Sequence, residues 1–237
     1  MKELSVFADE SGNPGDDAKY YLLALVFHDQ SEDVYEHIKR YEGTLAQRGL
    51  PDIPLHMNPL MRANGAYKGM PAQERNRLLT CFSSFAWKCP ISYEVLAYRK
   101  SHFRDDDGLL ARMKRDLVLL LFDRLEFLQG YDAVKIYYDD GQDMVTDTLH
   151  AAFEYALNKQ AVLYRDCSPS DFRLQQMADF ICEIELAAIK YEANEVGGTE
   201  KIFFGNRRDF KKNYLRKLRK KQMRPSSFSM VNAGVGV

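Results

Sequence analysis

The first half of the chain alternates between apolar stretches and segments rich in turn residues. Residues 4–8 and 19–28 are apolar runs separated by a segment of Asp, Asn, Gly and Pro, which predicts two antiparallel strands. Apolar positions then recur at helical spacing, which predicts helices over residues 31–49 and 71–87. Between these helices, residues 50–70 carry three prolines and two glycines, a composition typical of a surface loop.

The second half of the chain alternates between strand and helix patterns. The expected strands cover residues 91–98, 133–138 and 161–165, and the expected helices run from Asp105 to about Leu128, over 143–158, and from a cap at 168–171 to about Tyr191. Antiparallel strands followed by this alternation predict one mixed sheet covered by helices on both faces, a three-layer α/β/α domain. We expect residues 1–206 to form this domain, with a helical insertion at about 30–88.

Composition limits the class of protein. The chain has 237 residues, of which 46% are hydrophobic, enough for one large core. No basic segment leads into an apolar run of signal-peptide length, and no run approaches the ~20 residues that span a bilayer. We therefore expect a cytoplasmic protein without a membrane partner. The four cysteines and five histidines show no zinc-ligand spacing, so reduced thiols are expected.

Charge is distributed unevenly along the chain. Arg207 to Arg224 carry ten lysines and arginines and one aspartate, a net charge of +9, which leaves −10 for the rest of a chain whose formal net charge is −1. Phe210, Tyr214 and Leu218 fall on one side of a helix here, so residues 207–237 are expected to be a docked basic helix and a loose tail. The candidate nucleic-acid-binding residues are Arg207, Arg208, Lys211, Lys212 and Arg216. The alternative is a structural helix whose lysines only solvate it.

Two of the predicted strands end in paired acids. Asp9 and Glu10 follow the first strand, and Asp139 and Asp140 follow the strand 133–138. Adjacent carboxylates repel one another, a cost that a divalent cation would remove. The alternative for the first pair is an ordinary turn, because Asp, Asn, Gly and Pro are also common turn residues.

A third acidic position lies inside the last long predicted helix. Asp179 is flanked by large apolar residues, and Gln175, Gln176 and Glu183 share its side of the helix. A carboxylate in such surroundings is costly unless it is paired or bound to metal. The alternative is that this polar stripe is the solvated side of the helix.

These three motifs together resemble the DUF3800 family, whose members are similar to ribonuclease H-like nucleases. The resemblance is carried by residues 9–12 (Asp-Glu-Ser-Gly), by Asp139 and by residues 176–180 (Gln-Met-Ala-Asp-Phe). It implies a ribonuclease H-like fold and a divalent-metal-dependent nuclease with Mg²⁺ or Mn²⁺ held by Asp9, Asp139 and Asp179. It also implies support from Glu10 and Gln176, and an association with phage defence or mobile elements.

The chain departs from the family pattern at two places. Gln175 stands where leucine is more usual, and the helix ending near Leu128 offers no matching glutamate, so Glu10 is the candidate to replace it. Hard carboxylate oxygens from separate segments suit phosphodiester hydrolysis on DNA or RNA. Further supporting candidates are Asp140, Glu183 and His56, a loop histidine whose alternative is a surface role. The rival function is a non-catalytic module that binds nucleic acid or protein.

Overall fold

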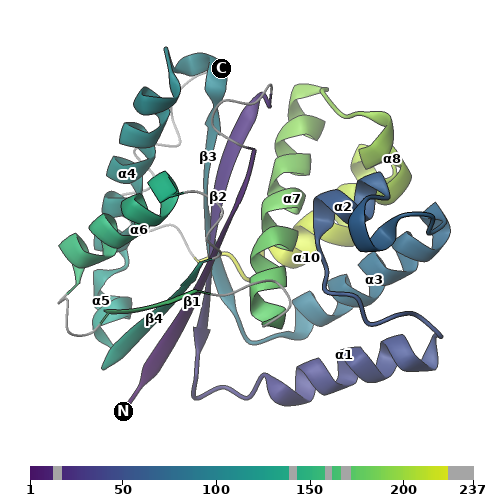
Figure 1. The fold of residues 1–237 in the computed structure, drawn as a ribbon, viewed down its shortest axis with the longest axis horizontal. Helices are drawn as coiled ribbons and strands as arrows, with labels where there is room; N and C mark the ends of the chain where they lie inside the picture. The colour runs from purple at the N-terminus through teal and green to yellow at the C-terminus, as the bar shows by residue number, and fades with distance from the viewer. Residues whose placement is uncertain (13–17, 139–142, 158–161, 167–171, 224–237) are drawn as a thin grey trace.

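A mixed sheet of five strands runs through the part of the chain that the computed structural model describes, namely residues 1–12, 18–138, 143–157, 162–166 and 172–223. The strands are β1 (Glu3–Ser11), β2 (Tyr20–Asp29), β3 (Ser92–Arg99), β4 (Ala133–Tyr138) and β5 (Val162–Asp166), in the spatial order β3-β2-β1-β4-β5. β1, β2 and β3 are antiparallel neighbours, and β4 and β5 run parallel to β1. The expected three-layer α/β/α class with a mixed central sheet is confirmed (Figure 1).

Strand β1 lies at the centre of the sheet and separates two apolar cores. Its side chains alternate between faces, so Leu4, Val6 and Ala8 join one core while Phe7 joins the other. Both faces of a central strand must be covered, which explains why residues 4–8 are a continuous buried run.

One face of the sheet is covered by α4 (Asp106–Asp123), α5 (Leu125–Gln129) and α6 (Asp143–Ala156), on the left in Figure 1. Asp105 caps α4 by accepting a hydrogen bond from the Gly108 amide at 2.9 Å. The prediction of one continuous helix to Leu128 is wrong, because the chain breaks at Arg124, whose guanidinium contacts the buried Glu94 carboxylate on β3.

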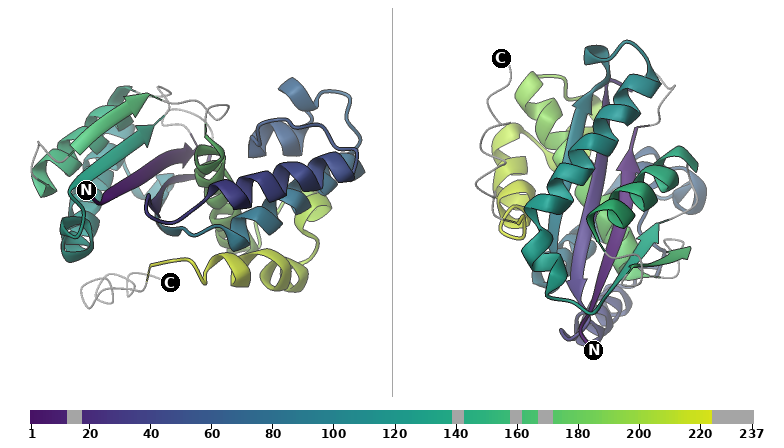
Figure 2. Two further views of the ribbon diagram at one scale, coloured as in Figure 1. Left: turned by 90° about the horizontal axis from the view of Figure 1, so that it is seen from below. Right: turned by 90° about the vertical axis from the view of Figure 1, so that its left-hand side faces the viewer.

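The opposite face is covered by α7 (Arg173–Ala193), around which the other helices gather (Figures 1 and 2). α1 (Tyr35–Gln47) and α3 (Ala72–Lys88) pack against one another beside it. The helix predicted from residue 31 begins later, at Tyr35, because the Asp33 carboxylate accepts a hydrogen bond from the Tyr35 amide at 2.8 Å. The expected α7 cap at 168–171 lies outside the described residues.

Residues 50–70 are not the surface loop that their prolines suggested. They contain α2 (Met57–Arg62) and the 3-10 helix Gly65–Tyr67, and the side chains of Leu55, Met57, Leu60, Met61 and Tyr67 are buried. The Arg75 guanidinium donates to the backbone carbonyls of Leu60 and Met61, at 2.5 and 2.9 Å. These long-range bonds fold the segment onto the domain.

The C-terminal part of the described chain forms short helices, beginning with α8 (Gly198–Phe204), which the sequence pattern did not predict. The expected basic helix consists of α9 (Arg207–Phe210), a π-helical turn (Lys211–Leu215) and α10 (Arg216–Leu218). Its Phe210 side chain stacks on Tyr191 of α7 with ring centroids 4.7 Å apart. Residues 224–237, the expected loose tail, lie outside the described residues.

Two other expectations concern membranes and thiols. Within the described residues, every helix is too short or too polar to cross a bilayer. Cys81, Cys89 and Cys182 are buried free thiols, as expected, and Cys167 lies outside the described residues.

Candidate functional site

Asp9 and Glu10 lie inside strand β1, not in a turn after it. The strand continues to Ser11, with Asp9 opposite Ala24 of β2 and Glu10 opposite Leu23. Because side chains alternate along a strand, the two carboxylates belong to opposite faces of the sheet. The prediction that Asp9 and Glu10 form an acidic pair in the turn after the strand is therefore wrong. The strand ends where Gly12 adopts φ +84°; a Cβ there would lie 2.3 Å from the Tyr20 carbonyl oxygen, so glycine is required.

Glu10 is surrounded by tyrosines from the two neighbouring strands. The Tyr138 hydroxyl, at the end of β4, donates a hydrogen bond of 2.8 Å to Glu10 Oε2. The pKa values of Tyr138 and Tyr21 are both raised, mainly by burial and then by the nearby Glu10 charge, so both phenols stay protonated. The Tyr21 hydroxyl is buried and has no hydrogen-bond partner among the described residues, so a polar ligand beside Glu10 would satisfy it.

Asp9 faces α7, which lies close against the end of β1. The Gln175 amide donates to the Ala8 carbonyl oxygen at 2.8 Å, and the Cys182 thiol donates to the Asp9 carbonyl oxygen at 3.3 Å. The pKa of the Cys182 thiol is raised well above its ordinary value, first by burial, then by the charges of Asp9 and Asp179, with Glu10 contributing less. These contacts hold the acidic end of β1 against the side of α7 that carries Asp179.

Asp179 also holds the inserted segment against α7. Its Oδ2 accepts a 2.7 Å hydrogen bond from the Met57 amide, at the N-terminus of α2, and lies 3.2 Å from His56 Nδ1. Gln176 Oε1 accepts a 3.0 Å hydrogen bond from the Leu55 amide. Gln175 and Gln176 are buried, so the alternative that this stripe is the solvated side of α7 is wrong.

Glu183 lies one helical turn beyond Asp179, at the wall of a cavity of about 430 Å³. Burial, with smaller contributions from the Asp179 and Glu200 charges, raises the pKa of Glu183 to about 7, although Lys190 and Arg62 oppose the shift. The cavity lies between the β1–β2 connection, α2, α7 and α8. Its lining includes Ser11, Gly12, Tyr20, Asn58, Arg62, Glu183, Lys190, Glu195 and Glu200.

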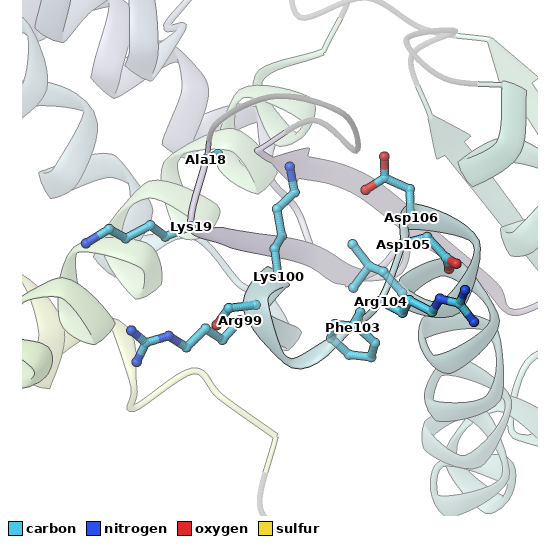
Figure 3. Close-up of a pocket in the computed structure, with 10 residues that line it drawn as sticks. Ala18, Lys19, Arg99, Lys100, Phe103, Arg104, Asp105 and Asp106 are labelled. Atoms are coloured by element: carbon cyan, nitrogen blue, oxygen red, sulfur yellow. The ribbon is translucent and has the colours of Figure 1, made fainter.

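A second cavity, of about 460 Å³, lies between the start of β2, the end of β3 and the start of α4. Four cationic side chains, Lys19, Arg99, Lys100 and Arg104, line it. Figure 3 shows that these groups diverge: Lys19 and Arg99 point to one side and Arg104 to the other. Lys19 Nζ lies 3.2 Å from a Glu195 carboxylate oxygen, and the Arg99 guanidinium lies 3.6 Å from the same atom. Among the described residues, these cations therefore do not converge on one point of the cavity.

The remaining predicted residues fall in different places. Asp139 and Asp140 lie outside the described residues. Strand β4 ends just before them at Tyr138, which is opposite Ala8 in the parallel register of β1 and β4. In the C-terminal segment, Arg207, Arg208, Lys212 and Arg216 are exposed, whereas Lys211 is half-buried.

The tyrosines around Glu10 are the contacts that sequence reasoning missed. Tyr138 directly precedes Asp139 in the sequence, and this position at the end of a strand could have indicated that Tyr138 lies near the acidic residues. Tyr21 gave no such signal, because its approach to Glu10 depends on how β1 and β2 pair.

The described side chains suit a hard divalent cation by their chemistry. Asp9, Glu10, Asp179 and Glu183 offer carboxylate oxygens, the donors that Mg²⁺ and Mn²⁺ prefer. Within the described residues alone, no group of three or more acidic, histidine or cysteine side chains is placed to hold a metal ion. A complete ligand set therefore needs a donor from the remaining residues.

No family model matches the chain, and no curated protein matches it significantly. The chain is similar to the crystal structure of ribonuclease H2 from Pyrococcus horikoshii OT3, at 14% identity and a TM-score of 0.43, over 84% of this chain and 80% of that one. It is also similar to a chain in the structure of the PCNA:RNase HII complex from Archaeoglobus fulgidus, at 15% identity and a TM-score of 0.43, over 83% and 81% of the two chains. The fold class rests on the strand order and directions described above.

Proposed function

We propose that this protein is a divalent-metal-dependent enzyme that hydrolyses phosphodiester bonds of nucleic acid. The observation that carries the proposal is the packing of α7 against the acidic end of β1. Gln175 and Cys182 donate to the backbone carbonyls of Ala8 and Asp9, and both lie on the side of α7 that carries Asp179. Carboxylates brought together from a strand and a helix repel one another, and a cation between them would offset that cost.

Asp9 and Asp179 are the proposed metal ligands, joined by Asp139 as the sequence predicts. Bound Mg²⁺ or Mn²⁺ would supply an activated water and stabilise the leaving oxygen of the phosphodiester. Two further carboxylates would support these ligands. Glu10 accepts a hydrogen bond from the Tyr138 hydroxyl on one face of the sheet, and Glu183 is on α7, which covers the other face. Gln176 and Asp179 hold the backbone of residues 55–57, so His56, with a side chain 56% exposed, lies beside the proposed ligand Asp179.

Membership of the DUF3800 family belongs to the same proposal and rests on the three sequence motifs. A nucleic-acid substrate fits the basic C-terminal segment, whose exposed arginines and lysines suit a phosphate backbone. The proposal leaves DNA and RNA as alternative substrates.

A non-catalytic binding module is the second candidate. It is favoured by the contacts of Asp179 Oδ2 with the Met57 amide and His56, because a carboxylate at a helix N-terminus has a structural role without any metal. The two candidates differ in whether a divalent cation stabilises the fold.

Thermal unfolding with Mg²⁺ or Mn²⁺, compared with EDTA, separates these candidates. At a metal concentration 100 times the dissociation constant, binding adds about 2.7 kcal/mol of stability, which corresponds to a Tm rise of roughly 5 to 10 °C for a chain of this size. Asp9→Asn and Asp179→Asn should each lose most of this rise.

The matched control is Asp107→Asn, at the exposed start of α4, which should keep the full metal-induced rise. Each variant is compared with itself in EDTA, so any loss of basal stability cancels. An unchanged rise in Asp9→Asn, or none in the wild type at millimolar metal, would favour the binding module.

A further inference from the structure

The C-terminal helical segment presents an exposed row of cations. Arg208, Lys212 and Arg216 follow one another at four-residue intervals, and Lys220 continues the series in the turn after α10. All four are exposed, and their side chains make no ion pair within the described residues. We call these four residues the basic ridge.

The π-helical turn keeps the basic ridge straight. In an α-helix of 3.6 residues per turn, positions four residues apart drift steadily around the axis. The turn Lys211–Leu215 is π-helical and contains more residues per turn, so it offsets part of that drift. Successive cations therefore rise about 6 Å along the same side of the segment.

The other side of this segment is anchored firmly to the domain. Phe210, Leu215 and Leu218 are buried, and Lys217 Nζ lies 3.8 Å from the centroid of the Trp87 ring. The Arg219 guanidinium donates a 2.8 Å hydrogen bond to Glu185 on α7. The backbone under the basic ridge is therefore already ordered before any ligand binds, which lowers the entropic cost of binding.

The basic ridge lies apart from the carboxylate site. The chain after α10 bridges Tyr93 on β3, at one edge of the sheet, whereas Asp9 is on the central strand and β4 and β5 form the other side. Figure 2 shows the C-terminal helices on the opposite side of the molecule from β4 and β5. A ligand on the ridge would therefore contact the molecule at the β3 side and not at β4 and β5.

We propose that the basic ridge binds the phosphodiester backbone of nucleic acid as an anchor separate from the carboxylate site. A straight row of unpaired cations on an ordered support is complementary to a row of phosphates. A membrane surface suits it less, because the apolar side of the segment is buried against the domain and cannot enter a bilayer. The proposal does not depend on hydrolysis.

Fluorescence anisotropy with a labelled 20-mer, as duplex DNA and as single-stranded RNA, in EDTA, tests this anchor. Four neutralised phosphates on a duplex give a salt slope of about −3.6, so a fourfold rise in KCl should weaken wild-type binding about 150-fold. The triple variant Arg208→Ala, Lys212→Ala, Arg216→Ala should bind at least about tenfold more weakly at 0.1 M KCl, with a slope near −1.

The control carries the same charge change on other exposed cations, Lys39→Ala, Arg40→Ala and Lys114→Ala, and should bind like the wild type. Because EDTA removes divalent metal, this binding is measured without the proposed hydrolysis, so either proposal can fail without the other. Equal binding by the triple variant and the control would overturn the anchor. The anchor would also be overturned if the wild type bound neither nucleic acid, or if the ridge residues were needed only for binding to phosphatidylserine vesicles.

Discussion

Replacing Glu183 with Gln should remove the fall in the free energy of unfolding that the wild type shows between pH 4.5 and about 7. The pKa of Glu183 is raised from its ordinary 4.5 to about 7, chiefly by burial at the wall of the cavity beside α7. Glutamine has nearly the same shape and cannot ionise, so it keeps the packing while removing the titration.

The sign follows from proton binding. Between pH 4.5 and about 7 the folded state binds more protons at Glu183 than the unfolded state, so stability falls as pH rises through this window. The raised pKa corresponds to a loss of at most about 3.4 kcal/mol above pH 7. Because Glu183 is partly exposed to the cavity, we expect a loss of about 1 to 2 kcal/mol after solvent screening.

Urea unfolding in EDTA at pH 5, 6, 7 and 8 measures this difference. The free energy of unfolding of wild type minus that of Glu183→Gln should fall across the window and level off by pH 8. Glu36→Gln, on the exposed side of α1, should instead stay parallel to the wild type at every pH. Parallel curves for Glu183→Gln, or a difference that grows with pH, would refute the reasoning.

Two stability predictions follow from backbone and charge. Gly12→Ala should destabilise the fold by about 1 to 3 kcal/mol in thermal unfolding, because φ is +84° and the new Cβ would lie 2.3 Å from the Tyr20 carbonyl oxygen. Gly43→Ala, in α1 with open space around it, should stabilise by about 0.5 to 1 kcal/mol, and similar effects of the two changes would contradict the argument. Arg124→Ala should cost about 3 kcal/mol in urea unfolding, because the buried Glu94 carboxylate loses its partner, and a cost below 1 kcal/mol would show that the pair contributes little.

Elements bounded by strong local signals were predicted well from the sequence. Strand β4 has the bounds that its apolar run indicated, and α3 begins just after Pro71, which favours the first turn of a helix. These signals lie within a few residues of the element itself. The order of strands and helices was enough to predict the mixed sheet.

Elements fixed by distant contacts were not predictable in the same way. Residues 57–62 form a buried helix because Asp179 accepts from the Met57 amide and Arg75 donates to the Leu60 carbonyl, contacts that local composition does not reveal. The break at Arg124 likewise depends on Glu94, thirty residues away.

The sequence named acids on two elements that pack together, but not how their side chains are oriented. Asp9 and Asp179 lie on β1 and α7, which are in contact, and their role as metal ligands stays a prediction. That Glu10 belongs to the opposite face could not be foreseen, because it depends on β1 pairing with β2 as far as Ser11. The roles of Asp139 and Asp140 stay predictions.

Metal-dependent cleavage of labelled single- and double-stranded DNA and RNA tests the central claim most directly. With Mn²⁺, the wild type and the Asp107→Asn control should cleave at least one substrate, and EDTA should stop the reaction. Asp9→Asn, Asp179→Asn and Asp139→Asn should each lower the rate by about a hundredfold or more. Cleavage that survives EDTA and Asp9→Asn alike, or no cleavage of any substrate by the wild type, would contradict the account.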